Sequence, residues 1–155
     1  MFPNNSSMEI KVLEFEALSL NQLYQSLRLR SQVFVVEQDC VYQDIDNYDQ
    51  QALHILGFKD NLLVAYTRVF DPKTYTEQAS IGRVVVHPDF RKQSLGVEIM
   101  QKSIEVLKSR GHKLINISAQ CYLDQFYKDL GFVQTGKKYL EDGIPHQEMT
   151  LELNH

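Results

Sequence analysis

Two cations and a glycine lie between a strand-like segment and a helical one in the middle of the chain. Arg91 and Lys92 follow the apolar run that ends at His87–Pro88, and Gly96 comes shortly after them. The first N–H groups of a helix have no partner within the helix and favour an anion, and an arginine can bind phosphate through two hydrogen bonds. This spacing predicts a pyrophosphate site, although an ordinary helix start with two solvated cations fits it equally well.

The segments on either side predict the elements that position these residues. Ala79–Val86 is an apolar run whose three consecutive valines favour a strand buried on both faces. After Ser94, apolar residues recur at helical spacing to about Arg110, and Gly111 is typical of a helix end. We therefore expect the anion to lie between the end of a buried strand and the start of a helix.

Hydrophobic periodicity predicts the remaining elements. Further strands are expected over Glu9–Phe15, Leu53–Lys59, Leu62–Phe70, Leu114–Ala119, Phe132–Tyr139 and Ile144–Leu153, and further helices over Leu20–Val36 and Tyr122–Leu130. The order β-α-β-β-β-α-β-α-β-β predicts an α/β (α+β) layered fold. The segment Asp39–Gln51, here called the acidic loop, lacks periodicity and is long enough to suggest a role in substrate binding.

Composition limits the class of protein. The chain has 155 residues, 43% hydrophobic and 23% charged, which favours one folded domain over residues 1–155 with residues 1–7 frayed. A net charge of −4 argues against a nucleic-acid partner. No apolar run is long enough for a membrane span, and the N-terminus does not resemble a signal peptide, so we expect a cytoplasmic protein with reduced cysteines. No spacing of ligands predicts a metal.

The central segment resembles a known family motif. HPDFRKQSLG, from His87 to Gly96, is similar to the acetyl-CoA motif of the GNAT N-acetyltransferases, Gln/Arg-x-x-Gly-x-Gly/Ala. Arg91 and Gly96 fill its first and last places, whereas Ser94 stands where glycine is usual. A serine N–H still donates to phosphate if the local φ is negative. AQCYLDQFYKDLGF, from Ala119 to Phe132, resembles the second signature of the family, a helix with Phe-Tyr before Gly-Phe.

Four more blocks resemble the ElaA-like branch of that superfamily, and they span nearly the whole chain in order. They are Leu29–Asp46, His54–Gly57, Ile81–Val86 and Glu141–His146. The resemblance implies the GNAT acyl-CoA N-acyltransferase fold, a mixed central sheet of six to seven strands flanked by helices. It also implies acetyl-CoA as co-substrate and direct acetyl transfer to an amine in a ternary complex.

The resemblance assigns roles to residues of the central segment. Backbone N–H groups of about Val84, Val85 and Val86 would meet the thioester carbonyl, while the pantetheine lies along this strand. The residues expected to hold the pyrophosphate are Arg91, Lys92, Gln93, Ser94, Leu95, Gly96 and Val97. Tyr127, the tyrosine of the Phe-Tyr pair, would be the proton donor to the leaving thiolate, because a phenol can hydrogen-bond sulfur and release a proton. A core tyrosine is the alternative.

Three residues are candidates for the base that neutralises the amine, in the order Glu37, His54 and His146. Glu37 follows an apolar helix end, where partial burial would raise its pKa; a solvated carboxylate or an ion pair with Arg30 is the alternative. His54 begins a strand beside the acidic loop, and a histidine with satisfied hydrogen bonds is as good an interpretation. His146 lies near the last hairpin, where a surface histidine is an equal alternative, and we also expect it to help bind the acceptor.

Arg83 is a charge within an otherwise apolar strand and needs a partner. It orients an acid such as Glu37 or Asp46, meets an anionic part of the substrate, or points outward. Through Asp46 and its neighbours, the acidic loop would attract a cationic substrate, unless it is simply solvated.

The leading hypothesis is an acetyl-CoA-dependent N-acetyltransferase acting on a primary amine of a small molecule or a peptide. A non-catalytic CoA-binding module is one alternative. An acyltransferase similar to acyl-homoserine-lactone synthases is another, suggested locally by Arg-x-x-x-Phe at Arg30 and Phe34. The oligomeric state stays open, with a homodimer among the alternatives.

Overall fold

A computed structural model describes residues 8–154, so the expected fraying of residues 1–7 lies outside the described part. Seven strands form one mixed sheet in the order β1-β2-β3-β4-β5-β7-β6. Their bounds are β1 Glu9–Glu14, β2 Leu53–Lys59, β3 Leu62–Phe70, β4 Ala79–Val86, β5 Leu114–Gln120, β6 Val133–Glu141 and β7 Ile144–Glu152. Neighbouring strands are antiparallel except for β4 and β5, which are parallel.

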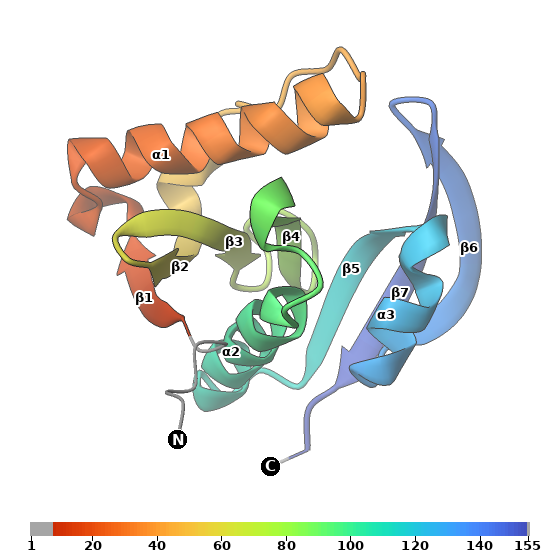
Figure 1. Cartoon of the computed structure of the whole chain (residues 1–155). Coiled ribbons are helices and arrows are strands. Elements are labelled where there is room, and N and C mark those ends of the chain that lie inside the picture. Colours follow the sequence, from red (N-terminus) through yellow and green to blue (C-terminus); the bar gives the residue numbers. More distant parts are fainter. Residues whose placement is uncertain (1–7, 155) are drawn as a thin grey trace, which may run out of the picture.

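Helices cover the two faces of this sheet (Figure 1). Helix α1, Leu20–Arg30, begins at a capping box in which Ser19 and Gln22 exchange side-chain and backbone hydrogen bonds. It continues without a break into a π-helical segment, Ser31–Glu37. Helix α2, Leu95–Ser109, and the short α3, Asp124–Asp129, lie on the other side.

The sheet opens between its two parallel strands. Only the start of β4 pairs with β5, through Ala79 with Ile115 and Ser80 with Asn116, and the two ribbons then diverge (Figure 1). Within residues 8–154, the remaining edge of β4 therefore has no strand beside it on the β5 side. Such an edge presents backbone N–H and C=O groups that an extended ligand can pair with.

A β-bulge lies in this free part of β4. Tyr66 pairs with Val85 and Arg68 with Gly82, so Arg83 and Val84 together oppose the single residue Thr67. Arg83 has φ 50°, a left-handed conformation that is rare for a residue with a side chain. The extra residue reverses which positions of the strand face each side of the sheet. Ile81 before the bulge and Val84 after it therefore pack toward the same core, and Val85 packs toward the other.

Two apolar cores fill the two sides of the sheet. The larger lies between the sheet and α2–α3 and includes Ile99, Leu107 and Tyr127. The smaller lies under α1 and includes Leu29, Val33 and Val85. The free end of β4 lies between both cores, which makes it a fixed support for a ligand.

The predicted elements are confirmed with small shifts at their ends, and the sheet has seven strands. The predicted helix over Leu20–Val36 is one continuous run, but it is π-helical from Ser31 onward. The predicted helix over Tyr122–Leu130 is shorter, because Cys121–Leu123 forms a 3₁₀ turn before α3. Within residues 8–154, no helix combines the length and apolarity needed to span a membrane.

Candidate active site

The first turn of α2 is open to a ligand. Ser94 is the residue before the helix, and its side chain makes no capping hydrogen bond, in contrast to Ser19 at α1. Within residues 8–154, the N–H groups of Leu95, Gly96 and Val97 therefore have neither an intrahelical nor a side-chain acceptor. Next to them, the carbonyl side chain of Gln93 accepts a hydrogen bond from Lys59 Nζ at 3.1 Å. The predicted anion site thus coincides with a helix N-terminus that lacks a side-chain cap, and anion binding there stays a prediction.

The conformation of Ser94 differs from the one expected. Its φ is 62° and its ψ is 20°, so it is left-handed, and Lys92 has φ 66°. Ser94 therefore does not meet the condition of a negative φ that was set for it. The left-handed conformation explains why glycine is usual at this place of the motif, because only glycine adopts it without steric cost. The loop reaches the same shape here with serine.

The start of α2, the end of β4 and α3 meet at Gly96. A Cβ atom on Gly96 would lie 3.4 Å from the Phe126 ring and 3.7 Å from Val86 Cγ2. Gly96 has an ordinary φ, so its use here is close approach rather than backbone freedom. Three segments that the resemblance assigned to one ligand are thus brought together.

Tyr127 is buried beside this meeting point. Its side chain is 6% exposed, and its ring makes edge contacts with Phe126 and Phe132. Burial raises the pKa of Tyr127 above its ordinary value, so the hydroxyl is protonated at neutral pH. Within residues 8–154 the hydroxyl makes no hydrogen bond. The residue is a core tyrosine that still has a proton to donate.

Glu37 and Arg91 form a bidentate ion pair. Arg91 Nη2 and Nη1 donate to the two carboxylate oxygens of Glu37 at 2.6 and 2.8 Å, and both side chains are about two-fifths exposed. Hydrogen bonds from Arg91 lower the pKa of Glu37, so the expected rise of this pKa is wrong, as is Arg30 as its partner. The pair links the loop before α2 to the end of the π-helical segment.

His54 is sealed inside the protein. It is 1% exposed; Nε2 lies 2.9 Å from the Asp49 carbonyl and Nδ1 lies 2.6 Å from the Tyr66 hydroxyl. Because a carbonyl only accepts, Nε2 carries the proton and Nδ1 accepts from Tyr66. Burial lowers the pKa of His54. Both ring nitrogens are occupied, as in the alternative interpretation of a satisfied histidine.

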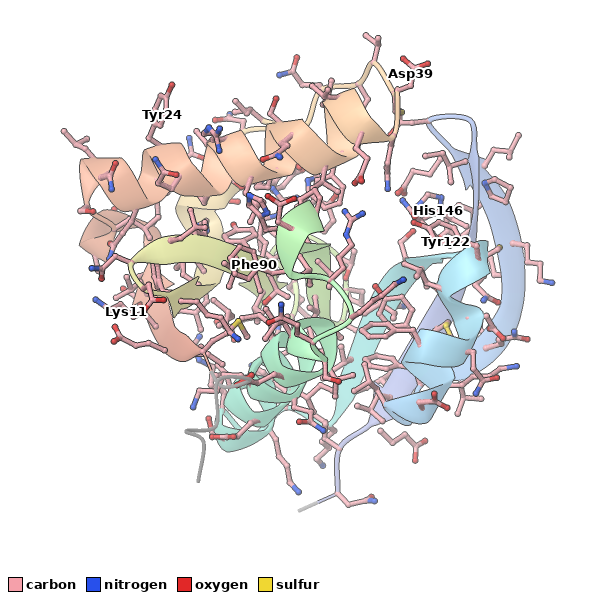
Figure 2. The ribbon with its side chains drawn as sticks, in the orientation of Figure 1. Lys11, Tyr24, Asp39, Phe90, Tyr122 and His146 are labelled. Atoms are coloured by element: carbon pink, nitrogen blue, oxygen red, sulfur yellow. The ribbon has the colours of Figure 1, made fainter. Side chains whose placement is uncertain are left out.

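His146 is buried, with 6% exposure, and is not the surface histidine that was the alternative. Its Nδ1 lies 2.8 Å from the Ile144 carbonyl, and its Nε2 lies 3.4 Å from a carboxylate oxygen of Glu141. The ring stacks on Tyr139. It lies at the same end of the β5–β7 unit as Tyr122 (Figure 2).

A buried ion network fixes the acidic loop. Arg30 is fully buried and contacts Asp44 at 3.1 Å and Asp49 at 2.9 Å. Arg68 is 1% exposed and contacts Asp49 and Asp46, each at 2.8 Å. Burial alone would raise the pKa of Asp46 and Asp49, but the arginines outweigh it and lower both. Removing one member of such a network leaves an uncompensated buried charge.

Arg83 extends the network to the bulge of β4. Its Nε lies 2.8 Å from Asp44 and its Nη2 lies 3.3 Å from Asp46. Of the partners predicted for Arg83, Asp46 is confirmed and Glu37 is not. Arginines pair with Asp44, Asp46 and Asp49, so these carboxylates are not free charges, and a role of the acidic loop in attracting a substrate stays a prediction. The loop supports the bulge.

Comparisons with known proteins decide the family. Residues 16–153 match the family model described as acetyltransferase (GNAT) domain. The chain belongs to the GNAT acetyltransferase family. It is 41% identical to the protein ElaA of Escherichia coli over 149 residues, which cover 94% of this chain and 97% of ElaA.

Solved structures of this family have the same fold. The crystal structure of Escherichia coli ElaA matches with a TM-score of 0.86 at 40% identity, over 94% of this chain and 99% of that one. An acyl-CoA N-acyltransferase from Pseudomonas aeruginosa matches with a TM-score of 0.88 at 36% identity, over the same shares. The CoA-dependent acyl-homoserine lactone synthase BjaI matches with a TM-score of 0.78 at 18% identity, covering 96% of this chain and 85% of the synthase. The last likeness concerns the fold alone.

Sequence reasoning missed one member of the GNAT domain's buried network, Arg68, and did not predict that the carboxylates of the acidic loop pair with it. A signal existed for Arg68, which interrupts the apolar run of β3 as Arg83 interrupts β4. Arg68 and Arg83 lie in adjacent strands, and the rule that a buried charge needs a partner applies to both of them. The left-handed backbone at Arg83 had no such signal.

No three His, Cys, Asp or Glu side chains in the described range are grouped as metal ligands. A hollow of about 200 Å³ lies at the opposite end of α2, where Leu53, Val69 and Arg110 line it. None of the predicted site residues lines this hollow.

Proposed function

We propose that the protein is an N-acetyltransferase that transfers the acetyl group of acetyl-CoA to a primary amine by direct attack in a ternary complex. One observation carries the proposal. The uncapped start of α2, the free edge of β4 and the helix of Tyr127 converge where Gly96, Val86 and Phe126 meet. A ligand with a polyanionic group, an extended amide-bearing arm and a thioester would use these features in that order. The helix start would bind the anionic group, the strand edge would pair with the arm, and Tyr127 would serve the thioester.

The pyrophosphate would accept hydrogen bonds from the N–H groups of residues 93–97 at the start of α2. Lys92 adds a positive charge. Arg91 adds a second one, but it must first leave Glu37. An exposed ion pair contributes about 0–1 kcal/mol, so a pyrophosphate can displace the carboxylate at small cost.

The pantetheine would pair with the free edge of β4 as an added strand. The thioester carbonyl then faces N–H groups of the stretch from Val84 to Val86, which can stabilise its developing negative charge. N–H groups alternate between the two edges of a strand, and the His87 N–H donates to the Val64 carbonyl of β3. Val84 and Val86 therefore direct their N–H groups to the free edge, whereas Val85 directs its own to β3. The ion network of Arg83 holds this part of β4 in its bulged form. Arg83 and Asp46 are therefore proposed to position the site rather than to bind the acceptor through a free charge.

The chemical step forms a C–N bond and breaks the C–S bond. The neutral amine attacks the carbonyl carbon, and the sulfur leaves as a thiolate that takes the proton of Tyr127. The nitrogen sheds one proton on becoming an amide, and water returns a proton to the phenolate. Each cycle thus gives one N-acetyl amine and one CoA thiol, and leaves the enzyme unchanged.

The acceptor is a small molecule or peptide with a primary amine, and we place the reaction in the cytoplasm, within a single domain. Cys40 and Cys121 are free thiols, which is typical of a reducing compartment.

Substitution of Tyr127 tests this function. Tyr127→Phe keeps the ring and its packing but removes the proton, so turnover with an accepted amine should fall by roughly 10²-fold or more. The dissociation constant of acetyl-CoA should stay within about twofold, since the hydroxyl acts only when sulfur leaves. Tyr24→Phe, on the exposed side of α1, is the matched control and should change neither value. Unchanged turnover in Tyr127→Phe would refute the assignment of the acid.

A further inference from the structure

Four polar side chains form a connected cluster on β5, β6 and β7. The Tyr139 hydroxyl donates to Ser118 Oγ at 2.6 Å, and Ser118 Oγ lies 3.4 Å from one carboxylate oxygen of Glu141. The other carboxylate oxygen of Glu141 lies 3.4 Å from His146 Nε2. The stacked rings of Tyr139 and His146 complete the cluster. It contains a histidine and a carboxylate that the proposed acyl-transfer step has not used.

The hydrogen bonds of His146 define where its free electron pair lies. Nδ1 faces the Ile144 carbonyl at 2.8 Å, and a carbonyl can only accept, so Nδ1 carries a proton. In the neutral ring, Nε2 is then an unprotonated acceptor 3.4 Å from the acceptor oxygen of Glu141. Two acceptors face each other with no proton between them. A donor that brings a proton to Nε2 converts this contact into an ion pair.

The cluster lies beside the proposed acyl site. His146 pairs with Gln120 at the end of β5, and Gln120 leads directly into the 3₁₀ turn before α3. Tyr122 in this turn is close enough to interact electrostatically with both Tyr127 and Arg91. Figure 2 draws Tyr122 and His146 at this end of the unit, below Asp39, which lies in the turn after the π-helical segment.

The cluster also connects to the opposite wall. The Gln120 amide lies 3.5 Å from Gln38 Oε1, just after the π-helical segment. The thiol of Cys40 lies 3.6 Å from the Asp142 carbonyl in the β6–β7 turn. At this end of the cluster the side chain of Glu141 is 52% exposed, so its carboxylate is accessible to a ligand from solvent.

We propose that His146, assisted by Glu141, is the base that takes the proton from the acceptor, and that the acceptor is a primary amine that arrives as an ammonium cation. This inference rests on the proposed function. An N–H bond of the ammonium group breaks, an Nε2–H bond forms, and the neutral amine is left to attack the thioester. The Glu141 carboxylate stays ionised beside the new imidazolium.

The other two candidate bases fit this role less well. The carboxylate of Glu37 is occupied by Arg91 through both oxygens. His54 has both nitrogens bonded and is enclosed in the smaller core's side of the sheet. Of the three, His146 alone combines an unprotonated nitrogen with an adjacent carboxylate that is exposed.

The groups that face His146 come from the two strands on either side of it. Strand β6 contributes Tyr139 and Glu141, and β5 contributes the uncharged Ser118 and Gln120. Glu148 lies two residues farther along β7, where its carboxylate accepts a hydrogen bond from the Asn116 side chain. Among the described residues, Glu141 is therefore the charged group in direct contact with the ring.

The test compares two accepted amines in His146→Asn. A lysine-type alkylamine has a pKa near 10.4, so only about one molecule in a few thousand is neutral at pH 7, whereas the α-amine of an amino-acid amide, with a pKa near 8, is about one-tenth neutral. Loss of the base should lower kcat/KM for the alkylamine by roughly 10²-fold or more. It should lower the value much less for the amide, and the deficit should narrow as pH rises toward 10.

Two further variants keep the test decisive. His112→Asn removes a histidine whose Nε2 also lies beside a carboxylate, Asp71 at 2.8 Å, but far from the cluster, and it should leave both rates unchanged. Glu141→Gln acts at an exposed side chain and should give a smaller loss with the same dependence on the amine.

Equal losses for both amines at every pH, in His146→Asn and in Glu141→Gln, would overturn the base assignment while the wild-type activity stands. A wild-type protein that binds acetyl-CoA but releases no thiol with any amine would overturn the proposed function itself, and the base role with it.

Discussion

Replacing Ser94 with glycine should stabilise the protein. Ser94 has φ 62°, and a residue with a Cβ pays roughly 1–2 kcal/mol in this left-handed conformation. Glycine avoids that cost but loses about 0.5–1 kcal/mol through the greater freedom of the unfolded chain. The side chain of Ser94 makes no cap hydrogen bond that would be lost. The net expectation is about 0.5–1 kcal/mol of added stability.

For a chain of this length, each kcal/mol corresponds to about 2–4 °C, so Tm should rise by about 1–4 °C. The assay is thermal unfolding without CoA, followed by circular dichroism. Ser19→Gly is the matched control: Ser19 also precedes a helix, but has φ −69° and a real cap, so it should lose a few tenths of a kcal/mol. If Ser94→Gly lowers Tm as Ser19→Gly does, the account of the loop's strain is wrong.

The ion pairs give three further predictions. Glu37→Gln frees Arg91 for pyrophosphate and should tighten CoA binding by at most about fivefold, which corresponds to the free energy of an exposed ion pair. Calorimetry measures this change in the dissociation constant. Weaker binding would contradict the view that Glu37 and pyrophosphate compete for Arg91. Arg30→Met leaves Asp44 and Asp49 buried with fewer partners and should lower the free energy of unfolding in urea by about 3–5 kcal/mol. Arg28→Met, at an exposed position of the same helix, should hardly change this free energy. Equal losses in the two variants would show that the network does not stabilise the fold. The lowered pKa values of Asp46 and Asp49 contribute stability that is fully present above the ordinary carboxyl pKa of about 3.9 and is lost as pH falls through the lower folded-state values. The urea midpoint should therefore stay flat from pH 7 to 5 and drop toward pH 3. This loss of stability in acid should be smaller in Arg68→Met.

The fold was largely predictable because its signals are local. The alternation in β1, the apolar runs of β2 to β4 and the Gly111 stop after α2 all appear in short windows of sequence. The π-helical winding over Ser31–Glu37 was not, because its apolar spacing is that of an ordinary helix.

The anion site was predictable as a place but not as a conformation. A helix start after a strand can be read from sequence, whereas the left-handed backbone at Ser94 depends on how the loop closes between β4 and α2. The partners of the arginines were harder still. Arg30, Arg68 and Arg83 come from three elements, and only the folded sheet brings them to one loop. Long-range pairing of this kind leaves only a hint in sequence, a charge where an apolar residue is expected.

The central claim is direct transfer of acetyl from CoA to an amine. The most direct test incubates the purified protein with acetyl-CoA and a panel of primary amines, and counts CoA thiol released against N-acetyl amine formed by mass spectrometry. We expect one thiol for each N-acetylated amine, release that depends on the amine, and no acetyl group on the protein when the amine is left out. Thiol release that is the same with and without amine, or an acetylated protein in its absence, would contradict the account.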